Sequence, residues 1–335
     1  MHFLILIFPK TIVYDTSKIL KISHPKNRKK YFIISGALIL IAVISTFLFG
    51  VLLDIQFKGG AIITYSYEGE LDKDELGSLV EETIGMQVSV QQSTDIATGK
   101  DNVVVSVVDA KSLDAETQSA LSTEIEQKFS DNNIELMQIS NVDPTIGNEF
   151  LMKSIVAVGL AMLLMIIYIA FRFRKIGGWS AGVMSVIALL HDCIVVYAVF
   201  IIFQLPLDLN FIAVLLTILG YSINATIVVY DRIRENKRLH SRDWSFDMLV
   251  NKSINQSITR SVNTTIATLI SMVVVCVVGL IFNLDSIFTF AFPLCIGLVC
   301  GCYSSLCIAV PLWTVWQDHK AGKTGYKKTK QKLRV

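Results

Sequence analysis

Six long apolar runs constrain what this chain can fold into. They cover residues 31–53, 150–170, 178–203, 208–230, 261–282 and 287–311. A helix needs about 20 predominantly apolar residues to cross the hydrocarbon core of a bilayer, and every run is that long. The pattern therefore predicts a polytopic α-helical membrane protein with six transmembrane helices. The first run lies too deep for a signal peptide and no small-residue cleavage site follows it, so we expect it to be retained.

The charged residues, only 17% of the chain, are unevenly placed. Between Asp54 and Asp143 there are 18 acidic and 5 basic residues, a balance of −13. Basic residues gather in four other places: 10–30, 172–175, 232–260 and 320–334. Because cytoplasmic loops carry the excess of Lys and Arg, we expect both termini and the loops at 171–177 and 231–260 in the cytoplasm. The acidic segment then lies outside.

These assignments divide the chain into five parts. In order they are a basic cytoplasmic segment (1–30), the first transmembrane helix (31–53), an extracytoplasmic domain (54–145), a five-helix transmembrane bundle with a cytoplasmic loop at 231–260 (146–316), and a basic cytoplasmic tail (317–335). We expect the tail to contact anionic membrane lipid rather than nucleic acid. All six cysteines lie in apolar runs, where packing is their ordinary role, so no disulfide framework is expected outside.

The extracytoplasmic segment has the pattern of a small α+β domain. Alternating or β-branched stretches predict strands, and stretches with helical spacing predict helices. In order they are strand 60–67, helix 72–84, strands 86–92 and 103–108 joined by a hairpin loop at 97–101, helix 115–129 and strand 134–139. This β-α-β-β-α-β order is the ferredoxin-like arrangement. The domain lacks Cys and His, which argues against a transition-metal site, and its acidic surface either serves solubility or binds a partner or an extended polypeptide at a sheet edge.

Several motifs lie inside or beside the apolar runs. They are FKGG (Phe57–Gly60), LHD (Leu190–Asp192), GYSIN (Gly220–Asn224), YDRIREN (Tyr230–Asn236), SINQS (Ser253–Ser257) and GCYSS (Gly301–Ser305). With these motifs in this order, the chain resembles the SecF family of the resistance-nodulation-division superfamily. The DRIREN block is the most specific of them. The pair Gly59 and Gly60 corresponds to the family's glycine signature, although Gln56 and Ala61 stand where Asp and Thr are usual.

The resemblance implies a function in protein export. SecF-like chains form half of a twelve-span assembly with SecD and work beside the SecYEG channel, with a YidC-type insertase as a further candidate partner. The assembly is expected to use the proton motive force to draw exported polypeptide across the bacterial cytoplasmic membrane. We expect no enzymatic activity, no cofactor and no metal, and no GxxxxGK[ST] nucleotide motif is present.

Ionisable residues inside a span cost about 2.5–3.5 kcal/mol on insertion scales, so each needs a reason. Asp192 lies near the middle of the third run, and is either a proton-carrying or gating carboxylate or a hydrogen-bonded residue that fixes this helix to a polar neighbour. His191 lies about 100° away around the helix, so we do not expect the two side chains to share a face. Arg260 either snorkels to the interface or, as the resemblance implies, belongs to an intramembrane proton pathway.

Further polar residues in the apolar runs are expected to join helices, as amides and hydroxyls do in membranes. These helix-packing candidates are His191, Asn255, Gln256, Asn263 and Thr264.

Asn224 and Ala225 of the fourth run are the remaining proton-pathway candidates, and Ala225 is the less expected residue of the two. In most relatives an aspartate implicated in proton transfer stands at this position, and alanine cannot bind a proton. Three explanations remain open. Arg260 pairs with a membrane aspartate of the partner that transfers the proton, or Asp192 takes the proton-transfer role, or this subunit is poorly coupled or driven differently.

The charged run that follows, Asp231 to Asn236, has helical pairing potential. Its spacing predicts the pair Asp231–Arg234 and a pair between Arg232 and Glu235 or Asn236. The run is either a solvated helix end or a cytoplasmic cluster that relays movement between the fourth and fifth spans.

Two other functions are compatible with the chain. One is a small-molecule or lipid exporter of the same superfamily, which would have to dimerise because six spans are half of what such exporters carry. The other is a scaffold that stabilises the translocon without energy coupling, and Ala225 keeps that alternative open.

Overall fold

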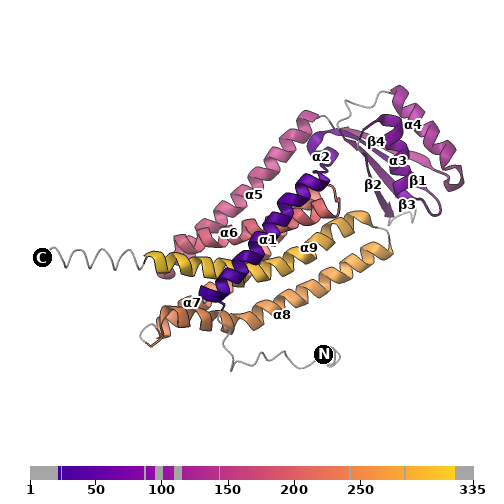
Figure 1. The fold of residues 1–335 in the computed structure, drawn as a ribbon. Coiled ribbons are helices and arrows are strands. Elements are labelled where there is room, and N and C mark those ends of the chain that lie inside the picture. Colours follow the sequence, from indigo (N-terminus) through magenta and orange to yellow (C-terminus); the bar gives the residue numbers. More distant parts are fainter. Residues whose placement is uncertain are drawn as a thin grey trace, which may run out of the picture.

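The computed structural model describes residues 22–23, 25–86, 88–94, 101–108, 115–142, 144–240, 243–282 and 284–320. In this part of the chain, long helices form a bundle and a small α+β domain lies at one end of it (Figure 1). We call the opposite end of the bundle the distal end.

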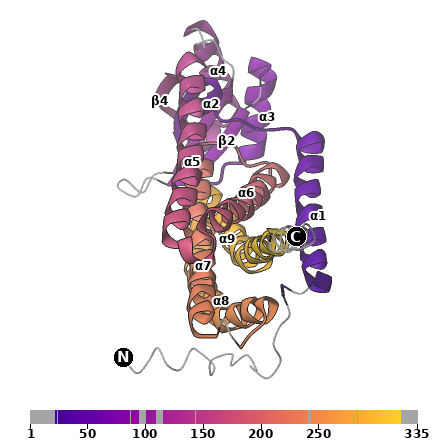
Figure 2. The same cartoon turned by 90° about the vertical axis from the view of Figure 1, so that its left-hand side faces the viewer.

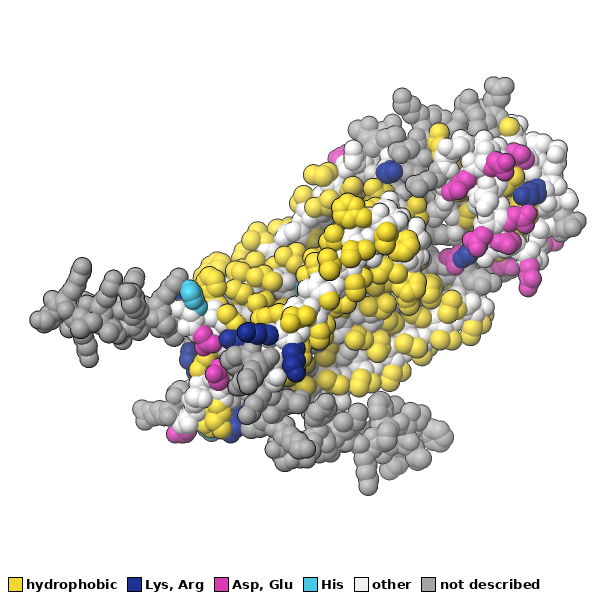
Figure 3. Space-filling view, in the orientation of Figure 1, with side chains coloured by type: hydrophobic (Ala, Val, Ile, Leu, Met, Phe, Trp, Pro, Cys, Tyr) yellow, Lys and Arg dark blue, Asp and Glu magenta, His cyan; other side chains and the backbone are white. Residues whose placement is uncertain are grey.

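The bundle consists of six helices that are long and apolar enough to cross a membrane, which confirms the predicted spans. They are α1 (Pro25–Phe49), α5 (Pro144–Arg172), α6 (Gly178–Ile202), α7 (Leu209–His240), α8 (Phe246–Ile281) and α9 (Asp285–Ser304), the last continuing through a π-helical turn (Ser305–Ala309) to Lys320. Helices α6 and α9 are the most buried, while α1 and α5 flank the bundle on opposite sides (Figure 2). Apolar side chains cover the bundle between the acidic domain and the basic distal end (Figure 3).

Two helices extend well beyond their apolar runs. Because α7 continues to His240 and α8 begins at Phe246, the predicted loop at 231–260 is wrong: most of it is helix. Charged pairs stabilise the end of α7, and the Ser245 hydroxyl accepts a hydrogen bond from the Met248 amide as the N-cap of α8. Hydrophobicity marks where a helix crosses the membrane, but not where it ends.

The α+β domain contains a four-stranded antiparallel sheet in the order β2-β3-β1-β4. Its elements are α2 (Ile55–Lys58), β1 (Gly60–Tyr67), α3 (Lys73–Ile84), β2 (Val88–Thr94), β3 (Asp101–Val108), α4 (Ala115–Lys128) and β4 (Glu135–Val142). From β1 to β4, the connectivity is the predicted split βαβ arrangement. Leu76 and Val80 of α3 and Leu121 and Ile125 of α4 pack into one core with the sheet. Apart from Asp101, the predicted hairpin loop at 97–101 lies outside the described residues.

The glycine pair Gly59–Gly60 makes the turn from α2 into β1. Gly60 has φ +146°, and a Cβ there would collide with the backbone carbonyl oxygen of Val107. At the start of α5, a Cβ on Gly147 would lie 2.8 Å from the Gly59 nitrogen. The glycines therefore allow the domain, α2 and α5 to pack backbone against backbone.

Substituting Gly60→Ala is expected to destabilise the domain by about 2 kcal/mol or more, because it combines overpacking with backbone strain. Hydrogen–deuterium exchange of the purified chain should show faster exchange of the β1 and β3 amides. The control is Gly77→Ala within α3, where a Cβ would make only ordinary contact with Val90. Equal protection in both variants would contradict this account of the glycine pair.

Candidate functional site: two polar groups at mid-height of the bundle

A buried polar cluster surrounds Asp192 of α6 at the centre of the bundle. The residue is 0% exposed. Its Oδ2 accepts hydrogen bonds from Ser222 of α7 and Ser304 of α9, both at 2.7 Å. Its Oδ1 lies 3.3 Å from the Cys300 thiol, which donates to it. One carboxylate therefore holds three helices together.

The cluster continues along one face of α7. The Ser305 hydroxyl donates to the Ser222 carbonyl at 2.9 Å, and the Thr226 hydroxyl donates to Ser305 at 3.0 Å. Ser222, Thr226 and Tyr230 follow one another at intervals of four residues, so they share that face. The sequence analysis did not predict these hydroxyls as partners of Asp192, although their four-residue spacing indicates a shared helix face. Ser305 opens the π-helical turn, a distortion that is frequent at functional sites.

The expectation that His191 and Asp192 would not share a face is wrong. The His191 Nδ1 lies 3.3 Å from Asp192 Oδ1 and 3.8 Å from the Cys300 sulfur. Although the two residues leave the helix in different directions, both side chains turn into the same space beside α9. Ligand atoms of the three residues lie within 4.8 Å of one another, and hydrogen-bond contacts link their side chains.

The second group of predicted site residues lies on the outer surface of α7 and α8. The side chains of its members are exposed, and we call them the polar face: Asn224, Arg260, Asn263 and Thr264. Ala225 lies beside them, half-buried. The structure therefore separates Arg260 from Asp192, which faces the interior of the bundle.

Two hydrogen bonds between α7 and α8 place the polar face at one level. The Tyr221 hydroxyl donates to Thr265 at 3.1 Å, and Arg232 Nε donates to Gln256 at 2.8 Å. Asn224 and Arg260 lie between these two links. Asn224 lies two residues from Ser222, which donates to Asp192 near the middle of α6. The polar face therefore lies at about the level of the buried Asp192 cluster, at mid-height of the bundle.

The remaining helix-packing candidates differ in what they bind. Gln256 joins α7 to α8, because its Oε1 accepts hydrogen bonds from Arg232 and Asn236. The Asn255 amide and the Thr264 hydroxyl donate to backbone carbonyls of their own helix. Asn236 also donates to the Ser253 hydroxyl at 2.8 Å, so this residue of the charged run is a buried link between the helices.

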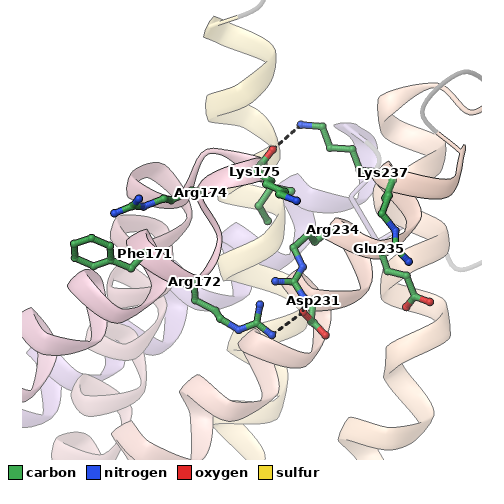
Figure 4. Close-up of a pocket in the computed structure, with 10 residues that line it drawn as sticks. Phe171, Arg172, Arg174, Lys175, Asp231, Arg234, Glu235 and Lys237 are labelled. Atoms are coloured by element: carbon green, nitrogen blue, oxygen red, sulfur yellow. Dashed lines mark hydrogen bonds and ion pairs between the residues drawn. The ribbon is translucent and has the colours of Figure 1, made fainter.

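Both expected pairs of the charged run are present. Arg234 pairs with Asp231, and Arg232 pairs with Glu235 at 2.7 Å. Asp231 also lies 3.4 Å from Arg172 at the end of α5, so the run connects α7 to a neighbouring helix (Figure 4).

Two buried carboxylates at the domain end were not predicted. Asp54 caps α2, and Asp208 precedes α7 with its Oδ1 accepting from the Phe211 amide at 3.1 Å. Between them, the chain segments at Leu52–Asp54 and Leu207 exchange backbone hydrogen bonds. Burial raises the pKa of the Asp208 carboxyl to about 6, against the opposing hydrogen bonds from Phe211 and Asn210. Burial also raises the pKa of Asp54.

The stability of the protein is expected to depend on the Asp208 carboxyl. The folded chain takes up a proton near pH 6, whereas the unfolded chain does so near 3.8, so this group adds stability as the pH falls through that window. The gain is at most about 3 kcal/mol. Asp208→Asn removes it. Thermal unfolding in detergent should therefore show that the wild type gains stability relative to the variant when the pH is lowered from 7.5 to 5. An unchanged stability difference would contradict the raised pKa of Asp208.

Known proteins are similar to this chain in both sequence and fold. Residues 122–319 match the family described as protein export membrane protein SecD/SecF, C-terminal. The chain is 34% identical over 297 residues to protein translocase subunit SecF of Alicyclobacillus acidocaldarius, covering 88% of this chain and 92% of the relative. It is 33% identical over 300 residues to protein translocase subunit SecDF of Bacillus subtilis, covering 89% of this chain but 38% of the relative.

A crystal structure of SecDF from Thermus thermophilus, named there as a translocon-associated membrane protein, has a TM-score of 0.69 and 29% identity to this chain. The similarity covers 87% of this chain and 38% of that one, so this chain spans well under half of the solved SecDF. A SecDF structure in a super-membrane-facing form has a TM-score of 0.62. With the six apolar helices, these similarities identify a multi-pass membrane protein. The chain belongs to the SecF family of protein translocase subunits.

Proposed function

We propose that this chain is the SecF half of a SecD–SecF assembly that assists Sec-dependent protein export across the bacterial cytoplasmic membrane. The observation that carries the proposal is the uncovered polar face at mid-height of α7 and α8. A cation and amides that face hydrocarbon are costly, so in a bilayer another polypeptide covers them. The Bacillus relative supports SecD as that polypeptide, because its name is SecDF and this chain matches 38% of its length.

The proposed energy source is the proton motive force, and we expect Arg260 to pair with a carboxylate of the partner. Arg260 is exposed on the polar face, and Ala225 beside that face offers no carboxylate of its own. Asp192 is a weaker candidate, since Ser222, Ser304 and Cys300 already donate to it inside the bundle. The geometry thus favours the first of the three explanations for Ala225.

The proposed orientation has the distal end and both termini in the cytoplasm and the α+β domain outside. It rests on the charge asymmetry, with basic side chains at the distal end and acidic side chains over the domain. The domain has two edge strands, β2 and β4. In β2, the Gln92 amide donates to Asp285 at the start of α9, so the bundle holds that edge. Strand β4 is therefore the better edge for an extended exported polypeptide.

Complementation tests this function. The chain is expressed together with its cognate SecD-type partner in a bacterium depleted of its own SecD and SecF, and the processing of a pulse-labelled Sec-dependent precursor is followed. The expected result is restored processing. If the protein accumulates in the membrane at a normal level and processing stays at the depleted rate, the export assignment is wrong.

A further inference from the structure

We infer that the distal end contains a binding site for the phosphate headgroup of an anionic phospholipid, in a basic cavity between the α5–α6 turn and α7. The cavity measures about 830 Å³. Its lining contains six cations and two carboxylates: Arg172, Arg174, Lys175, Arg234, Lys237 and Arg238, with Asp231 and Glu235 (Figure 4). We call it the basic cavity.

The two carboxylates of the basic cavity are already neutralised. Asp231 is shared by Arg172 and Arg234, and Glu235 pairs with Arg232, which lies outside the lining. The other cations of the lining have no carboxylate partner within the described chain: Arg174, Lys175, Lys237 and Arg238. Their uncompensated charge favours an anion with several acceptor oxygens, as a phosphate has.

The shape of the basic cavity is stabilised by contacts that do not pair these cations with carboxylates. Lys237 of α7 donates to the backbone carbonyl of Lys175 at 3.2 Å, which ties the α5–α6 turn to α7. The Arg174 guanidinium lies over the Phe171 ring, 4.5 Å from its centroid. The cations are therefore positioned around one space rather than dispersed over a loop.

The apolar surface next to the basic cavity suits acyl chains. An exposed stripe of α5 leads to Phe171, which itself lines the cavity, and every member is more than half exposed: Leu160, Leu164, Tyr168 and Phe171. Trp179, at the start of α6, is 66% exposed, and exposed tryptophans are typical of the headgroup level of a membrane. A phosphate above a stripe of apolar side chains matches a phospholipid better than a free anion. Basic pockets of this kind between membrane helices bind anionic lipid headgroups.

The test measures lipid affinity of the full chain by native mass spectrometry in a neutral detergent. The probes are dioleoyl phosphatidylglycerol, dioleoyl phosphatidylcholine and soluble glycerol 3-phosphate. The variant Lys175→Gln/Arg238→Gln removes two unpaired cations of the cavity. The control Lys29→Gln/Lys30→Gln removes two exposed cations from α1 at the same end of the bundle.

The cavity variant is expected to bind phosphatidylglycerol about 10- to 30-fold more weakly than wild type, and phosphatidylcholine equally. The control variant should match wild type for both lipids. Equal phosphatidylglycerol affinity in wild type and cavity variant would overturn the proposal. So would glycerol 3-phosphate binding as tightly as the lipid, because the site would then serve a free anion.

Discussion

Arg260→Ala is expected to remove the proton-dependent part of export while leaving the fold intact. The side chain is exposed at mid-height of α8 and has no ion pair within the described residues, so its loss should change stability by less than about 0.5 kcal/mol. In the assembly, however, Arg260 is the cation proposed to pair with the partner's carboxylate. Proton flux and precursor export in reconstituted liposomes should fall to the level seen without a proton gradient.

The matched control is Lys153→Ala, which removes an exposed cation of α5 that pairs with Glu149 one turn away. It should leave flux and export unchanged. Normal flux in Arg260→Ala would show that the arginine answers no partner carboxylate. The complementary variant Ala225→Asp places a carboxylate next to the polar face. A gain in proton-dependent export would show that the alanine limits coupling, and no change would show that the position is dispensable.

Asp192→Ala is expected to destabilise the bundle by about 3–5 kcal/mol. The substitution removes the shared acceptor of three donors from two neighbouring helices at a fully buried position. Ser222 and Ser304 keep longer contacts to the Gly301 carbonyl, at 3.4 and 3.3 Å. Each unsatisfied buried group costs about 1–3 kcal/mol. Thermal unfolding of the purified assembly in detergent measures the loss.

Asp192→Asn separates a structural role from a proton-carrying one. The asparagine keeps one carbonyl oxygen for Ser222 or Ser304, so most of the stability should remain. If export driven by the proton gradient also remains, Asp192 fixes helices and carries no proton. If stability is kept but proton-dependent export is lost, the carboxylate itself carries the proton, which contradicts the proposed pairing of Arg260 with a proton-carrying carboxylate of the partner.

The six spans could be predicted from the sequence because the hydrocarbon core sets their length and composition. The ends of α7 and α8 could not, since charged pairs and a serine cap hold them in helical form outside the apolar runs. The order of strands and helices in the α+β domain could be predicted from alternating and helically spaced apolar residues. Strand β1 pairs with β3 and β4, as that order requires.

Only part of the candidate site could be predicted from the sequence. Asp192 could be selected because a carboxylate inside a span needs a partner, but its partners stand 30 and 112 positions away on α7 and α9. Which residues meet depends on how three helices are rotated and shifted against each other, and no local pattern encodes that. For the same reason, only the structure separates the interior Asp192 from the exposed Arg260.

In the proposed assembly, another subunit covers the polar face of α7 and α8. The native mass of the complex that co-purifies with the affinity-tagged chain from its own membranes in mild detergent shows whether it does. We expect a one-to-one complex with a SecD-type chain, and its loss in the variant Asn224→Leu/Asn263→Leu, which makes the face apolar. A homodimer, or a monomer free of any SecD-type chain, would contradict it.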